Sequence, residues 1–157
     1  MSITTLEDMR ATEGPLLGLD VGVKTIGLAL SDPARTLATP LETIKRTKFT
    51  ADAESLLEIA SERGVVGLIL GLPRNMDGTL GPKAQSVKTF AKNLAKKTEI
   101  PIAFWDERLS TAAAERSLID LDVSRRKRAA VIDSHAAAFI LEGAVDRLRT
   151  MEGHGAE

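Results

Sequence analysis

A run of residues near the middle of the chain is apolar at nearly every position. It extends from Val65 to Gly71, between Gly64 and Pro73. A strand with one face in water alternates apolar and polar side chains, whereas an unbroken apolar run predicts a strand that is buried on both faces. Such a strand belongs in the interior of a sheet that is covered on both sides, which favours an α/β domain.

Short strands are predicted before this run, and helices alternate with strands around and after it. Pro15–Asp20, Thr25–Ser31 and Leu37–Ile44 predict three strands with short turns, which is typical of an antiparallel meander. Helical spacing and capping residues predict helices over Ala51–Arg63, from Pro82 to about Leu94, from Ser110 to about Leu121 and over Ala130–Leu148, and a further strand over Ile100–Trp105. The order of elements predicts an α/β domain with a mixed sheet.

Size and composition restrict the class of protein. The 157 residues, of which 43% are hydrophobic, suit one globular domain, which we expect over 15–149 with frayed ends at 1–14 and 150–157. The net charge of −1 excludes a wholly basic surface but allows a local basic patch. The absence of cysteine excludes disulfides and thiolate metal sites. No signal peptide or membrane-spanning run is evident, so we expect a cytoplasmic protein without a membrane partner.

Three carboxylates stand out because of their apolar surroundings. Asp20 ends one predicted strand, Glu107 follows another, and Asp133 lies near the start of the last predicted helix, on the same face as Ala137 and Ala144. A buried acid must be paired, neutralised or bound to a metal. One acid on a core face and two at strand ends are the oxygen ligands that Mg²⁺ or Mn²⁺ requires. Two such ions about 3.5–4 Å apart activate water and stabilise the leaving oxygen of a phosphodiester.

Each acid also has a simpler explanation. Asp20 can start a turn, Glu107 can pair with Arg108, and Asp133 can stabilise the N-terminus of a helix. No positive partner stands near Asp20 in the sequence, so the three acids together favour a shared site over three separate structural roles. Their spacing leaves open whether they converge.

Four sequence blocks occur in the order and spacing of a known family. The blocks GLDVGVKTIGLALSD, GLPRNMDGTLGPKA, DERLSTAAAE and VIDSHAAAFIL resemble those of the YqgF family of RuvC-like proteins, over roughly Pro15 to Arg149. Members of that family are described as Holliday-junction resolvases or as nucleases that mature the 5′ end of pre-16S ribosomal RNA. The resemblance implies a ribonuclease H-like fold, a five-stranded mixed sheet flanked by helices, in agreement with the predicted order of elements.

The resemblance also implies which residues act. By position, the metal-binding catalytic acids would be Asp20, Glu107 and Asp133, the same three that their surroundings single out. RuvC-type nucleases usually place a fourth acid or histidine near the last aspartate, but Ala136 stands three residues later, and a helical His135 would point about 200° away from Asp133. Three acids would hold one ion well and a second with help from substrate phosphate. The match also marks Asp77, Gly78, Thr79, Arg108, Ser110 and Thr111.

Basic residues near these blocks are candidates for phosphate contacts. The run Arg125, Arg126, Lys127 and Arg128 precedes the predicted helix of Asp133, and it is equally compatible with a solvated loop. The other candidates are Lys24, Arg74 and Arg108. Aromatic residues make up only 3% of the chain, which argues against a platform for base stacking and favours recognition of shape and backbone.

The sequence thus favours a metal-dependent nuclease for structured RNA, most simply the ribosomal RNA precursor, with the ribosome as a further partner. A four-way DNA junction is an alternative substrate for the same hydrolysis. Symmetric cutting of a junction needs two active sites, so a homodimer would favour DNA as the substrate. A catalytically silent RNA-binding assembly factor is the third alternative. An actin-like phosphotransferase is disfavoured because 157 residues hold only one of its two domains and no GxxxxGK[ST] loop is present.

Overall fold

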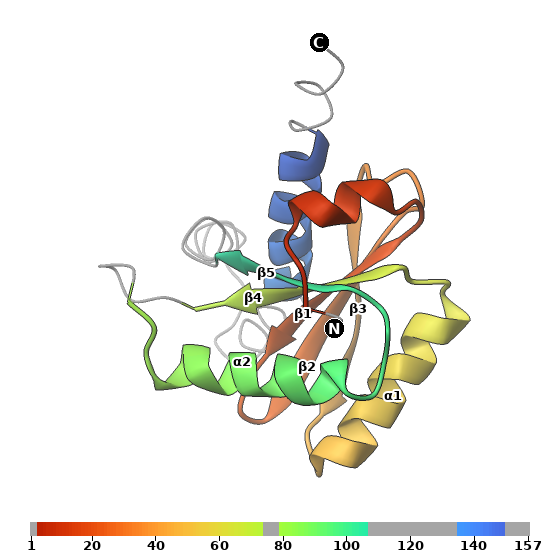
Figure 1. Ribbon diagram of the computed structural model, residues 1–157. Helices are drawn as coiled ribbons and strands as arrows, with labels where there is room; N and C mark the ends of the chain where they lie inside the picture. The colour runs from red at the N-terminus through yellow and green to blue at the C-terminus, as the bar shows by residue number, and fades with distance from the viewer. Residues whose placement is uncertain (1–2, 74–78, 107–134, 150–157) are drawn as a thin grey trace, which may run out of the picture.

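Five strands form one sheet in the order β3-β2-β1-β4-β5 (Figure 1). The computed structural model describes residues 3–73, 79–106 and 135–149. The strands are β1 (Leu16–Val21), β2 (Thr25–Ser31), β3 (Ala38–Lys45), β4 (Gly67–Leu72) and β5 (Ile102–Asp106). All five strands that the sequence predicted are present, within about two residues of the predicted bounds.

The sheet is mixed, as predicted. β1 pairs antiparallel with β2, and β2 with β3, which confirms the meander; β1 pairs parallel with β4, and β4 with β5. Leu19 lies opposite Leu70, and Leu70 opposite Phe104. The carboxyl ends of β1, β4 and β5 therefore reach the same edge of the sheet, where side chains from three parallel strands can meet.

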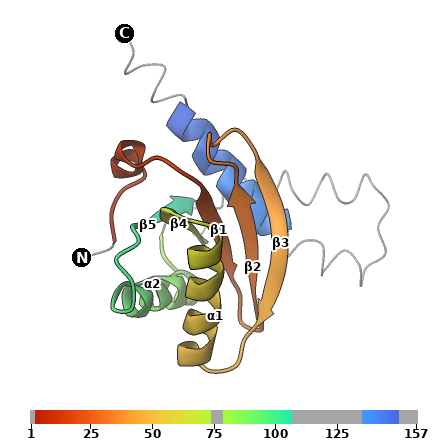
Figure 2. The same cartoon turned by 90° about the vertical axis from the view of Figure 1, so that its right-hand side faces the viewer.

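Helices cover the two faces of the sheet. α1 (Phe49–Glu62) and α2 (Pro82–Ala95) lie on one side, as Figure 2 shows, and pack on one hydrophobic core. Residues 135–149 form a helical segment whose buried side chains belong to a second core on the opposite face. Every residue of β4 is buried between these layers, which confirms the prediction from its unbroken apolar run.

The helical segment 135–149 packs closely on β1. Ala137 and Ala144 are fully buried, as their predicted helical face requires. A Cβ atom on Gly18 would lie 2.8 Å from Leu141 Cβ and 2.9 Å from the carbonyl oxygen of Ala137, so only glycine allows this approach. The helix predicted over Ser110–Leu121 lies outside the described residues. Within the described ranges, no helix combines the length and the apolar character needed to cross a membrane.

The expectation of a frayed N-terminus is wrong for residues 3–14. A 3₁₀ helix, η1 (Glu7–Ala11), buries Met9 completely, and Ile3 forms a parallel bridge with Ile102 at the edge of the sheet. The sulfur of Met9 would be 3.0 Å from a Cβ on Gly67, so the missing side chain of that glycine leaves the room that Met9 fills. This polar, aperiodic segment is ordered by long-range contacts that its own sequence does not reveal.

Arg35 holds the same segment from the β2–β3 connection. Its side chain is only 9% exposed and donates hydrogen bonds to the carbonyl oxygens of Gly14 and Met9, both at 2.9 Å, and to Oγ1 of Thr12 at 2.7 Å. Its backbone has a φ of 57°, a left-handed conformation that non-glycine residues seldom adopt. The guanidinium thus satisfies several acceptors of an irregular segment at once.

The β2–β3 connection also contains a carboxylate with a strongly lowered pKa. Hydrogen bonds from Thr36 Oγ1 and from the backbone N–H groups of Leu37 and Thr36 lower the pKa of Asp32 to about 2. The ionised form is therefore favoured in the folded state, and its contribution to stability is complete above a pH of about 4 and is lost as the pH falls towards 2.

We expect Asp32→Asn to destabilise the protein at neutral pH and to make less difference as the pH falls from 4 to 2, because the wild-type carboxylate is then protonated as well. Denaturant unfolding of both proteins across this range measures the difference. Thr36→Val, which removes only the hydroxyl donor, should raise the pKa of Asp32 and move the transition to higher pH. A gap between wild type and Asp32→Asn that is the same at both pH extremes would contradict the assignment.

Candidate active site

Asp20 lies on the central strand, at the edge where the parallel strands end. It is half-buried, and its backbone is opposite Gly27 of β2. Its neighbours Leu19 and Val21 belong to the core beneath α1 and α2. Since side chains alternate along a strand, the carboxylate of Asp20 points to the other face, the one covered by residues 135–149.

The end of β5 adds an aromatic side chain to this second face. Trp105 packs on the core that contains Ala103 and the helical segment. A Cβ on Gly143 would lie 2.6 Å from Cζ2 of Trp105, so the glycine lets the indole ring lie directly against the helix. The indole Nε1 is buried and has no hydrogen-bond partner among the residues that the structure describes.

The turn after Asp20 is held by backbone hydrogen bonds. The N–H of Gly22 donates to the carbonyl oxygen of Thr25 at 2.8 Å, and a Cβ on Gly22 would come within 2.9 Å of that oxygen. The carbonyl oxygen of Lys24 accepts the N–H of Arg46 at 2.8 Å. The side chain of Lys24 is exposed at this turn, where the sequence places a candidate phosphate contact.

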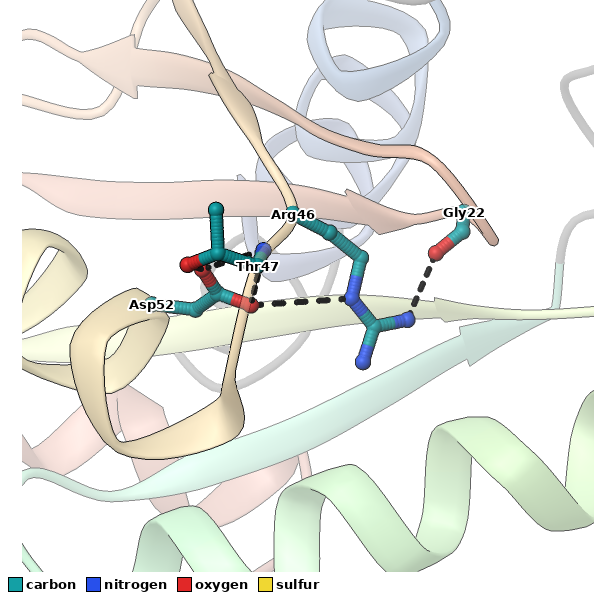
Figure 3. Close-up of polar contacts among 4 residues, drawn as sticks. All are labelled: Gly22, Arg46, Thr47 and Asp52. Carbon is teal, nitrogen blue, oxygen red and sulfur yellow. Dashed lines mark hydrogen bonds and ion pairs between the residues drawn. The ribbon is translucent and has the colours of Figure 1, made fainter.

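Arg46 and Asp52 link this turn to α1 (Figure 3). Nη1 of Arg46 donates to the carbonyl oxygen of Gly22 at 2.7 Å, and its Nε lies 3.9 Å from the carboxylate of Asp52. Asp52 is only 2% exposed and also accepts hydrogen bonds from the N–H of Thr47, at 3.1 Å, and from its hydroxyl, at 3.2 Å. The guanidinium lies 5.6 Å from the ring centroid of Phe90, in cation–π contact. Sequence reasoning did not identify this network, because no motif marks these residues.

Of the residues predicted to act, the structure describes Asp20 and Lys24, together with Thr79 from the MDGT block. Convergence of Asp20 with Glu107 and Asp133 therefore stays a prediction. In the part of the chain that the structure describes, no group of three or more histidine, aspartate or glutamate side chains is arranged to hold a metal ion. The following predicted residues lie outside the described ranges: Arg74, Asp77, Gly78, Glu107, Arg108, Ser110, Thr111, Arg125, Arg126, Lys127, Arg128 and Asp133.

The sequence matches known proteins over most of its length. The model of the RuvX family, described as Holliday junction resolvase, matches residues 14–147. A protein of Bradyrhizobium sp. strain BTAi1 is 64% identical over 142 residues, which cover 90% of this chain and 88% of the relative. A protein of Paracoccus denitrificans is 57% identical over 148 residues, which cover 94% of each chain. Both relatives bear the name "Putative pre-16S rRNA nuclease".

Solved structures resemble the fold at much lower sequence identity. RuvC of T. thermophilus, solved with a Holliday junction substrate, has a TM-score of 0.51 at 17% identity, over 87% of this chain and 97% of that one. The yeast mitochondrial Holliday junction resolvase Ydc2 also has a TM-score of 0.51, at 12% identity, over 95% of this chain and 88% of that one.

The sheet order and the likeness to RuvC and Ydc2 define a ribonuclease H-like fold, as predicted. The sequence matches are more specific, and they show that the chain belongs to the RuvX (YqgF) family. The resemblance carried by the four sequence blocks is thereby confirmed. The protein is a nuclease, a hydrolase that acts on phosphodiester bonds.

Proposed function

We propose that this nuclease depends on a divalent metal ion and processes the 5′ end of pre-16S ribosomal RNA, with Asp20, Glu107 and Asp133 as its metal-binding catalytic acids. The observation that carries the proposal is the position of Asp20 on the central strand, half-buried at the edge where β1, β4 and β5 all end. The names of the close relatives support the choice of RNA.

The course of β5 supports the inclusion of Glu107. Ala103 and Trp105 face the same side of the sheet as Asp20, because both pack on the core beneath residues 135–149. The next residue in this alternation is Glu107, one position after the end of β5. Continued strand geometry would direct its carboxylate to the face that carries Asp20.

The course of the helical segment supports the inclusion of Asp133. Figures 1 and 2 both show the C-terminal end of residues 135–149 beside η1, which precedes β1, so the segment runs opposite to β1. Ala137 lies over Gly18. Asp133 precedes Ala137 by four residues, a rise of about 6 Å along a helix. Asp20 follows Gly18 by two residues, a rise of about 6.6 Å along a strand. A helix continued backwards would therefore bring Asp133 towards Asp20.

The donor set fits a hard cation. Three carboxylates supply oxygen ligands only, which suits Mg²⁺ or Mn²⁺ and disfavours softer metals. When bound, such an ion activates water and stabilises the charge that develops on a phosphodiester. Lys24 at the turn after Asp20, with Arg74, Arg108 and the basic run 125–128, would hold the substrate phosphates. We further propose that the protein acts in the cytoplasm on ribosome-bound precursor.

A Holliday junction is the second candidate substrate, because the family description and the RuvC likeness both name it. The acids and the ion would perform the same hydrolysis on DNA. Paired incisions across a junction need two active sites, so this alternative requires a stable homodimer. Sedimentation of the purified protein tests that requirement.

Cleavage with and without metal tests the proposed function. We expect the purified protein with Mg²⁺ or Mn²⁺ to shorten the 5′ end of ribosome-bound precursor, and we expect EDTA to abolish cleavage and excess Mn²⁺ to restore it. Cleavage of a four-way DNA junction but not of the precursor would establish the resolvase. If neither substrate is cut and titration calorimetry detects no bound Mn²⁺, the catalytically silent assembly factor is the better description.

A further inference from the structure

A groove on the α1/α2 side of the sheet begins at the turn that follows Asp20. It consists of two adjoining hollows of about 360 and 380 Å³, which share Arg46 and Ser86. Val21, Gly22 and Val23 line one end of this α2 groove, and the first turn of α2 lines its side. The side chains of Asp20 and Val21 point to opposite faces, so the groove is separate from the catalytic face but starts at the same edge of the sheet.

The elements around the α2 groove are strongly basic. The stretch 82–97 contains five lysines and no acid, and four more basic residues occupy 24 and 45–48. Nine of the chain's 21 basic residues thus gather on these elements, although the net charge of the whole chain is −1. Lys83 and Arg46 line the groove itself. Lys88 and Lys92 line a separate hollow beside Ile3 and Phe104, so the basic residues of these elements do not all face the groove.

Arg46 is fixed in an orientation that suits an anion. Its Nε and Nη1 face Asp52 and the carbonyl oxygen of Gly22, and its side chain is 26% exposed. Nη2 makes no hydrogen bond within the described residues, and Arg46 lines both hollows of the groove. A guanidinium held by its neighbours loses little further entropy when it binds phosphate. The carboxylate of Asp52 partly offsets its charge, so Lys83 supplies the net positive charge.

The remaining lining favours a sugar-phosphate backbone over bases. Ser86, Thr89 and Asn93 lie at helical spacing along one face of α2 and offer hydroxyl and amide groups, the usual partners of phosphate and sugar oxygens. The two aromatic rings of the groove, Phe49 and Phe90, contact each other edge to face with centroids 5.4 Å apart. They are therefore occupied with each other and do not form a stacking platform.

We propose that the α2 groove binds the backbone of the RNA substrate outside the catalytic centre, so that a strand held by Arg46 and Lys83 passes over the sheet edge to Asp20. This inference rests on the proposed function for the identity of the ligand as RNA. It assigns substrate contacts to Arg46, which lies outside all four sequence blocks, and to Lys83, which the sequence analysis did not single out.

Equilibrium binding tests the proposal without cleavage. The probe is a fluorescently labelled transcript of the precursor 5′ leader, in EDTA and over a series of salt concentrations. We expect Lys83→Gln to weaken binding roughly three- to tenfold and to reduce the slope of log K against log salt by about 0.7–0.9, the loss of one phosphate contact. Arg10→Gln is the matched control, because it removes one exposed charge from η1, away from the groove.

A second variant probes the geometry of Arg46. Arg46→Lys keeps the charge but loses the planar fork, so we expect weaker binding with an unchanged salt slope. The lost hydrogen bond to Gly22 should also lower the melting temperature, so binding is measured well below it. If Lys83→Gln binds the RNA with wild-type affinity and salt slope, the groove does not bind the RNA backbone. The metal-dependent cleavage assay tests the catalytic acids independently of this result. If Lys83→Gln weakens the binding of a four-way DNA junction but not that of the RNA, the assignment of RNA as the ligand of the groove is wrong. If RNA binding depends on Lys83 but the RNA is not cleaved, the role of the groove in binding is supported and only the proposed cleavage activity is contradicted.

Discussion

Asp20→Asn is expected to reduce metal-dependent cleavage by roughly a thousandfold, the equivalent of about 4 kcal/mol of transition-state stabilisation. Asparagine has nearly the same volume and keeps one side-chain oxygen, but it lacks the negative charge that binds a hard cation. The effect is large because the proposed site has three carboxylates, so the ion would lose one of its three charged ligands.

The loss must be separated from unfolding and from a general change in charge. Asp20 is half-buried at a strand end, so the isosteric amide should leave the free energy of unfolding nearly unchanged. Asp146→Asn removes an exposed carboxylate on residues 135–149 and should cleave at the wild-type rate. Titration calorimetry with Mn²⁺ supplies a readout besides activity, and we expect binding to weaken in Asp20→Asn only. Full cleavage by Asp20→Asn would exclude this residue as a metal ligand.

The layers of the fold were predictable because local patterns agree with the final packing. The apolar run at Val65–Gly71 indicated a strand buried on both faces, and β4 is such a strand. β4 begins at Gly67, two residues after the start of the run, although the N–H of Val66 already donates to the carbonyl oxygen of Pro15. Pro82 marked the first position of α2 correctly, since its fixed φ suits a helix start.

The ordered N-terminus was not predictable in the same way. Met9 is buried because Gly67, far away in sequence, lacks a side chain, and Arg35 supplies donors to the carbonyl oxygen of Met9 and the hydroxyl of Thr12. Neither contact leaves a periodic signal in residues 3–14. A segment without local preference is ordered here by tertiary contacts alone.

The candidate site was predictable only in part. Asp20 was identified from its apolar surroundings and two flanking glycines, and the structure confirms its place at the strand end. Arg46 was missed because its role depends on Gly22, Asp52 and Phe90, which only the fold brings together. A signal available for the groove was the absence of acids among five lysines in 82–97.

Gly18→Val is expected to lower the free energy of unfolding by roughly 3 kcal/mol, at the upper end of what overpacking costs. The new Cβ alone would lie 2.8 Å from Leu141 Cβ and 2.9 Å from the carbonyl oxygen of Ala137, well inside ordinary contact distance, and valine adds two more carbons. A helix backbone cannot yield as a side chain can, so residues 135–149 must move away from β1. Gly18→Ala should cost less.

The same displacement tests whether this helix positions the catalytic acids. If Asp133 is carried towards Asp20 by residues 135–149, cleavage by Gly18→Val should fall under conditions in which the variant is still folded, although no acid has changed. Denaturant unfolding gives the stability, and the cleavage assay gives the rate on the same samples. Gly64→Asn is the matched control, because Gly64 has open space around its Cβ position and a φ of +66°, which asparagine tolerates. Wild-type stability in Gly18→Val would contradict the packing described here, and reduced stability with undiminished cleavage would mean that the helix does not hold an acid of the site.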